Sequence, residues 1–186
     1  HDDLAASVST ALRAVIDGSR VSSNEIALVS ISTTLATNAL VEGVGRPAAL
    51  IAIGFDDAAL TRGGLNDVLD EDPVVSLRGG HSSHGQEITP LDLTPLKMAL
   101  SDIDSRVEAY AVVGSFSVRN PAHEVAVADL IRTATGKPVT CSHELSEQLN
   151  GPKRAVTALL NARLIALVHD LLLAVETSMA SLDVTA

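Results

Sequence analysis

The sequence predicts an α/β fold in which a mostly parallel sheet carries helices on both faces. Short β-branched runs alternate with longer helical segments through short connections, an order that is typical of parallel sheets. The runs, such as residues 109–115, lack strict alternation of apolar and polar residues, which suits strands covered on both faces. Aromatic residues make up only 2% of the 186 residues, so the expected core consists of Ala, Val, Leu and Ile.

The first third of the chain predicts two helices that alternate with two strands. Two aspartates favour a helix start at the beginning of residues 2–18, where apolar residues recur on one helical face and a glycine ends the run. Residues 26–32 (IALVSIS) predict a buried strand. A short helix is expected over residues 33–42, and residues 46–54 (RPAALIAIG) predict a second buried strand.

The middle of the chain predicts an irregular, loop-rich insertion over residues 56–93. This segment contains two glycine pairs and a further glycine, which are strong turn signals. One short strand is expected inside it, over residues 74–77. Residues 93–107 then return to a helix, because Pro95 stands in the first turn, where proline is tolerated.

The last third repeats the alternation of strand and helix after the strand at residues 109–115. Asn120 predicts a helix N-cap and Pro121 the first helical position, and Gly136 is expected to end that helix. A short strand follows at residues 138–141. The final segment, residues 152–178, has a broad apolar stripe and predicts a long helix against the core.

Composition and charge exclude several classes of function. Thirteen basic and 23 acidic residues give a net charge of −10, which repels nucleic acid and anionic lipid surfaces. The most apolar stretch, residues 164–175, is short and contains His169 and Asp170, and the start of the chain is acidic, so neither a membrane span nor a signal peptide is predicted. A single cysteine excludes an internal disulfide, and the expected location is the cytoplasm.

Ser32, Thr33 and Thr34 stand where a predicted strand turns into a predicted helix. Their hydroxyls and the free N–H groups of the helix start can hold a phosphate or a carboxylate. The alternative is that Thr33 or Thr34 simply caps the helix, and the glycine-rich cradle of the usual phosphate loop is absent at this position.

The densest histidine cluster lies on a glycine-rich loop. His81 and His84 can ligate a metal there, with Glu87 or Asp92 as a carboxylate partner. The alternative is that these histidines are exposed or hydrogen-bonded loop residues.

Residues 116–124 (FSVRNPAHE) follow a buried strand directly, so they are expected at the carboxyl edge of the sheet, where open α/β folds bind ligands. Arg119 can clamp a carboxylate or a phosphate, and His123 or Glu124 can transfer protons. The alternative is structural: Arg119 pairs with an acid across the loop, and His123 caps the helix.

Two further polar residues have open interpretations. Cys141, beside His143, is expected to be a small buried hydrophobe rather than a nucleophile, because no third orienting group is evident. Asn161 lies seven residues after Arg154 on the same face of the long helix and needs a partner if it is buried. That partner can be a ligand, another domain or a loop carbonyl.

Six segments together resemble the N-terminal region of the hydantoinase/oxoprolinase family, in the family's order and over nearly the whole chain. They are residues 32–42 (STTLATNALVE), 54–57 (GFDD), 79–81 (GGH) with 90–92 (PLD), 117–124 (SVRNPAHE), 142–145 (SHEL) and 154–163 (RAVTALLNAR). The family usually reads Gly-Thr-Thr where this chain has Ser32-Thr33-Thr34.

The resemblance implies a ribonuclease-H-like fold related to the actin-like ATPases. It implies an enzyme that uses ATP and Mg to phosphorylate an amide or ketone oxygen, and then opens a cyclic amide of the hydantoin or 5-oxoproline type or carboxylates the enol phosphate. A hydantoinase B-type subunit is the implied partner. The implied catalytic residues are His81, His123 and Arg119. The implied substrate- or phosphate-binding residues are Thr33, Thr34, Asn38, Asn120 and Asn161.

One departure from the family pattern shapes the remaining expectations. Members begin with a strand and an acidic, glycine-rich phosphate loop, and nothing in residues 1–31 matches it. We therefore expect residues 1–186 to be a fragment of the N-terminal region that is inactive and holds no cofactor by itself. The alternatives are a non-catalytic lobe that contacts a partner subunit or swivels, and a carboxylase subunit of the same family. An oligomer is compatible with either.

Overall fold

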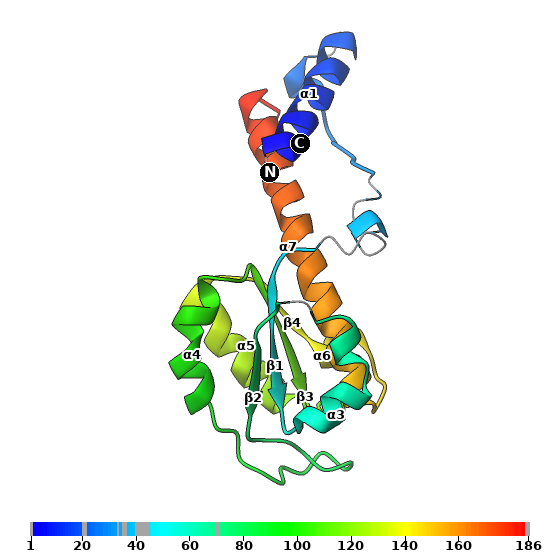
Figure 1. The fold of residues 1–186 in the computed structure, drawn as a ribbon. Coiled ribbons are helices and arrows are strands. Elements are labelled where there is room, and N and C mark those ends of the chain that lie inside the picture. Colours follow the sequence, from blue (N-terminus) through cyan, green and yellow to red (C-terminus); the bar gives the residue numbers. More distant parts are fainter. Residues whose placement is uncertain are drawn as a thin grey trace. The chain divides into compact units, whose positions relative to one another are not determined.

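The computed structural model describes residues 2–19, 22–32, 34, 37–39, 45–69 and 71–184 (Figure 1). The chain divides into two compact units, residues 43–166 and a second unit formed by residues 1–42 together with residues 167–186. The larger unit contains the sheet.

Four parallel strands form the sheet, which confirms the predicted fold class. They are β1 (Ala48–Ile53), β2 (Val74–Leu77), β3 (Ala109–Gly114) and β4 (Val139–Cys141), in the order β2-β1-β3-β4. The alternating sequence predicts parallel pairing because each strand returns through a crossover that runs back over the sheet.

Helices cover both faces of the sheet (Figure 1). Helices α4 (Thr94–Asp104) and α5 (Ala122–Thr135) pack on one face, and α3 (Asp57–Arg62) and the first part of α7 (Gly151–Ser181) pack on the other. Every residue of β1 and β3 is buried, as expected of strands with both faces covered. The two core layers are aliphatic apart from Tyr110, Phe55 and Cys141.

The strand order creates a switch point between β1 and β3. Strand β1 connects to β2 on one side and β3 connects to β4 on the other, so the loops after β1 and β3 diverge at the carboxyl edge, where such sheets bind ligands. The loop of residues 78–93 crosses this edge, below the arrowheads in Figure 1. A hydrogen bond of 3.3 Å from the His81 N–H to the Ser115 carbonyl joins this loop to the carboxyl edge of the sheet.

Gly54, which follows β1, lies where the loop of residues 78–93 packs closely against the end of that strand. Its φ of +74° is left-handed, and a Cβ there would lie 2.6 Å from the carbonyl oxygen of Gly79. Gly136 has a similar φ of +70° but open space around it. We expect Gly136→Ala to cost about 1–2 kcal/mol, the usual left-handed penalty, and Gly54→Ala to cost clearly more in urea unfolding. Equal costs would contradict the proposed contact between the loop and β1.

Three sequence predictions differ from the structure or fall outside it. Residues 26–32 belong to no strand, and Leu28 is 80% exposed, so the predicted strand is wrong. Their β-branched composition favours a pleated surface, but a strand also needs a neighbour, and none of the described strands pairs with this segment. In the segment 56–93, β2 is the expected strand, and α3 and a 3-10 helix at Leu65–Asp67 are regular elements that the sequence did not predict. Residues 78–93 form the long loop of the segment. Most of the helix predicted over residues 33–42 lies outside the described residues.

The smaller unit contains α1 (Asp2–Ser19), the short 3-10 helix at Ser23–Glu25 and the end of α7. Apolar side chains from these elements and from residues 26–32 line a hollow of about 550 Å³. Among the described helices, α7 alone is long and apolar enough to cross a membrane by length and composition. Its first half is a core helix of the sheet domain, with Ala155, Leu159 and Ala162 fully buried.

Candidate functional site

A small hairpin in the loop of residues 78–93 begins the candidate site. Gly80 has a φ of +122°, which favours glycine, and it turns the chain at the carboxyl edge. Ser82 and Gln86 then close a tight turn through an N–H to carbonyl bond of 2.8 Å, and His81 and Glu87 form a β-bridge across it. The hairpin therefore presents His81 and Glu87 side by side.

His123, in the first turn of α5, joins the hairpin to the helix. Its Nδ1 accepts a hydrogen bond of 3.0 Å from the Gly80 N–H, and its Nε2 lies 2.8 Å from Oε1 of Glu87. The ring of His81 lies against that of His123, with centroids 4.2 Å apart. Burial lowers the pKa of His81, and the nearby His123 lowers it further against the opposing effect of Glu87, which favours a neutral imidazole.

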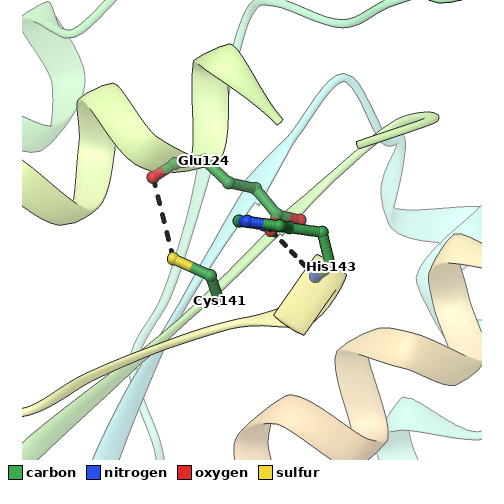
Figure 2. A group of neighbouring side chains, drawn as sticks. All are labelled: Glu124, Cys141 and His143. Carbon is green, nitrogen blue, oxygen red and sulfur yellow. Dashed lines mark hydrogen bonds and ion pairs between the residues drawn. The ribbon is translucent and has the colours of Figure 1, made fainter. Parts of the chain in front are cut away.

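Glu124, the next residue of α5, lies in a separate buried network (Figure 2). Its carboxylate is completely buried and accepts hydrogen bonds from the Gly114 N–H at 2.6 Å, the Ser142 hydroxyl at 2.6 Å, and the N–H and Nδ1 of His143 at 3.1 and 2.5 Å. Burial raises its pKa, but the bonds from His143, Ser142 and Ser117 outweigh burial and hold the pKa below its ordinary value. Glu124 is therefore an ionised carboxylate that ties the ends of β3 and β4 to α5.

Arg154, near the start of α7, supplies the opposite charge. It is 2% exposed. Its guanidinium donates to the carbonyls of Gly114 and Gln148 at 2.8 and 2.6 Å and to the hydroxyls of Ser117 and Ser142 at 3.0 and 3.2 Å. Burial lowers its pKa, and Glu124 opposes that shift. Glu124 and Arg154 thus hold the N–H and the carbonyl of Gly114, the last residue of β3.

Glu124, Cys141 and His143 are the one group of three potential metal ligands in the part of the chain that the structure describes (Figure 2). Two observations argue against a metal. The Glu124 oxygens are already occupied by four donors, and burial raises the pKa of the Cys141 thiol to about 12, so it stays a neutral thiol rather than the thiolate that metals prefer. The Cys141 sulfur instead lies 4.0 Å from the Glu124 carbonyl oxygen, as a buried apolar residue.

The Glu124–His143 pair predicts a pH dependence of stability. The bond to Glu124 raises the pKa of His143 above 6.5, so its contribution is complete below pH 6.5 and is lost as pH rises through the folded-state pKa. The pKa of Glu124 lies below 4.5, so its contribution is lost as pH falls through that lower value. We expect about 1–2 kcal/mol less unfolding free energy at about pH 9 than at about pH 6, measured by urea denaturation. His143→Gln should abolish this difference, whereas His169→Gln, at an exposed site, should keep it.

The structure gathers some of the predicted site residues at the carboxyl edge. His81, His123, Arg119 and Asn120 lie in the hairpin, in α5 or in the loop that precedes it. Asn120 donates from Nδ2 to the Gly85 carbonyl at 3.0 Å and so joins the loop after β3 to the hairpin. The Arg119 side chain is exposed and has no ion pair with any described residue. Its guanidinium is therefore available to an anion at this edge.

Other predicted residues lie elsewhere. Asn161 accepts a hydrogen bond of 3.1 Å from the Thr140 hydroxyl, which supplies the partner that a half-buried amide needs. His84 is exposed and lies 3.3 Å from the Ser83 hydroxyl, so a metal at His81 and His84 stays a prediction. Thr34 and Asn38 are exposed residues of the smaller unit, and Thr33 lies outside the described residues.

Sequence reasoning missed the centre of the buried network. It treated Glu124 as a possible proton carrier and Arg154 as a polar residue on an apolar helix, and did not pair them. One signal was present: an arginine within a helix that is otherwise buried needs an acidic partner.

These features define the class of protein: an α/β domain whose carboxyl edge, at the sheet's switch point, carries two histidines in ring contact and an exposed arginine. Two opposite buried charges, Glu124 and Arg154, are bridged there by Gly114 and Ser142. A model of the hydantoinase/oxoprolinase N-terminal region matches residues 1–135. The chain belongs to this family, as its sequence motifs predict.

Relatives of known function are much longer than this chain. Caprolactamase subunit alpha of Pseudomonas jessenii is 29% identical over 149 residues, which cover 71% of this chain and 21% of that protein. The acetophenone carboxylase gamma subunit of Aromatoleum aromaticum is 27% identical over 167 residues, which cover 75% of this chain and 23% of that protein. The chain therefore spans about a fifth of the length of these relatives.

Solved structures confirm the fold. The ATP-dependent caprolactamase from Pseudomonas jessenii superimposes with a TM-score of 0.72 at 23% identity, covering 94% of this chain and 28% of that one. Nucleotide-free acetone carboxylase gives a TM-score of 0.56 at 18% identity, covering 81% of this chain and 25% of that one. At these identities the likeness supports the fold alone.

Proposed function

We propose that this chain is the N-terminal region of an ATP-dependent hydrolase that opens a cyclic amide after phosphorylating the amide oxygen. The names of its relatives support an amide or ketone carbonyl as the reacting group, since one is a caprolactamase and another an acetophenone carboxylase. ATP and Mg would bind to the complete protein rather than to these residues alone. The proposed location is the cytoplasm.

The carboxyl edge is the proposed substrate side, and one observation carries this assignment. Arg119 is exposed, has no ion pair with a described residue, and its backbone packs against Gly85 in the hairpin that carries His81. Phosphorylation of an amide oxygen develops negative charge, which a guanidinium stabilises. A neutral imidazole can exchange a proton with the same carbonyl group. Asn120 would hold the loop that carries Arg119. Thr33, Thr34 and Asn38, which belong to the smaller unit, remain proposed phosphate- or substrate-binding residues.

A titration of the 186-residue chain tests the substrate edge. We expect caprolactam and 5-oxoproline to shift the amide NMR signals of Gly80, His81 and Ser115, and Mg-ATP to show no micromolar binding in calorimetry. Arg119→Ala should weaken 5-oxoproline about tenfold, since a charge-assisted bond contributes about 1.5 kcal/mol, and should leave neutral caprolactam unchanged. Arg13→Ala, on α1, is the matched control. Shifts confined to other surfaces would contradict the assignment.

A second candidate function is subunit interaction, because the smaller unit exposes apolar side chains at Val15 (68%) and Leu28 (80%). The relatives are named as subunits, so a partner of the hydantoinase B type is plausible for the complete protein. If Thr34→Ala and Arg119→Ala in the complete protein leave turnover intact but weaken subunit assembly, the interaction function is favoured over the catalytic one.

A further inference from the structure

The two histidines in ring contact at the edge, His81 and His123, are not equivalent. A backbone N–H can only donate, so the bond from Gly80 requires that Nδ1 of His123 accept and carry no proton. The proton of the neutral ring is then on Nε2, which donates to the Glu87 carboxylate at 2.8 Å. Both nitrogens of His123 are engaged within the protein, so it has no free lone pair for a substrate.

His81 is in the opposite situation. The residue is 2% exposed, and its ring nitrogens have no hydrogen-bond partner among the described residues. They are not among the buried polar atoms that lack a partner, so they reach the surface at this edge. The ring is held in place by its burial and by the His123 ring, while its nitrogens stay free of bonds within the described protein and open to a ligand at this edge. A neutral imidazole offers one donor and one acceptor, which suits the carbonyl of an amide or a ketone.

Glu87 connects these two features. Its backbone is bridged to His81 across the hairpin, and its side chain bonds to His123 on α5, 36 residues away in sequence. The Glu87 carboxylate therefore fixes both the tautomer of His123 and the position of the hairpin that carries His81. Its side chain is about half exposed, so the chain gains little apolar burial from it.

We infer that His81 is the group of this edge that contacts the carbonyl ligand, and that Glu87 is a positioning residue that acts through His123. This assignment rests on the proposed function for the class of ligand, an uncharged amide or ketone carbonyl. It reassigns His123, predicted to be catalytic, to a positioning role.

The first arm of the test needs no ligand. In the ¹⁵N-histidine-labelled chain at about pH 8, we expect His123 as a single Nε2–H tautomer, in wild type and in Glu87→Gln, which keeps an acceptor oxygen. Glu87→Ala should speed solvent exchange of that Nε2 proton more than tenfold, and Gln86→Ala, the adjacent control, should leave it unchanged. An Nδ1–H tautomer, or a mixture of tautomers, in wild type would overturn the inference.

The second arm adds caprolactam as the probe. We expect the ring nitrogens of His81 to shift, those of His123 to stay within the change seen for exposed His84, and Glu87→Ala to weaken binding about fivefold with Glu87→Gln near wild type. Shifts at His123 instead of His81 would overturn the role assignment while the proposed substrate edge survives. If caprolactam shifts no residue of the edge, the proposed function fails and with it the role of His81, whatever the first arm shows for the Glu87–His123 pair.

Discussion

Arg154→Ala is expected to lower the free energy of unfolding by about 3–5 kcal/mol, the range for leaving a buried charge uncompensated. The substitution leaves the Glu124 carboxylate buried without its countercharge. It also removes the donors that satisfy the Gly114 and Gln148 carbonyls and the Ser117 hydroxyl. Buried acceptors that lose their donors add a desolvation cost that no water can relieve in a packed core.

Urea denaturation followed by circular dichroism measures this loss. Arg106→Ala is the matched control, because that arginine forms an exposed pair with Asp102 four residues before it on α4. Exposed pairs contribute at most about 1 kcal/mol, so the control should be close to wild type. Similar costs for the two variants would mean that the Arg154 network is not a buried one.

Much of the fold follows from local sequence signals. The strands predicted at residues 46–54 and 109–115 are present as Ala48–Ile53 and Ala109–Gly114, and both are fully buried, as the lack of alternation predicts. The helix predicted after Asn120 begins at Ala122, and the Ala122 N–H donates a hydrogen bond of 3.1 Å to the Asn120 side chain. The same helix ends at Gly136, which is in the left-handed conformation. Helix caps and turns depend on residues that are close in sequence, so they can be predicted from the sequence alone.

The parts that sequence did not predict depend on partners far along the chain. The strand expected at residues 26–32 lacks a neighbour among the described strands, and composition alone carries no information about a neighbour. Glu87 and His123 meet only because the hairpin crosses the switch point to reach α5. Glu124 and Arg154 share Gly114 and Ser142 as partners only because α7 packs on the face opposite α5 and reaches the same edge. The sequence predicted which residues lie at the carboxyl edge of the sheet, but not which side chains form hydrogen bonds with one another there.

The strongest test of the buried pair is a double substitution. Glu124→Leu alone should cost about 3–5 kcal/mol, because Arg154 then stays charged and buried without a carboxylate. Glu124→Leu with Arg154→Met removes both charges, and we expect its cost to fall about 1–3 kcal/mol short of the sum of the single costs, the usual coupling between residues of one hydrogen-bond network.

The double variant should still be less stable than wild type, because the N–H groups of Gly114 and His143 lose the carboxylate that accepts from them. Urea denaturation of the four proteins in the cycle measures the coupling. A parallel cycle that combines Arg154→Met with Asp102→Ala, on α4 across the sheet, should be additive within about 0.5 kcal/mol. Equal coupling in both cycles would show that the loss reflects a general loosening of the fold, and the assignment of Glu124 and Arg154 as an interacting pair would then be wrong.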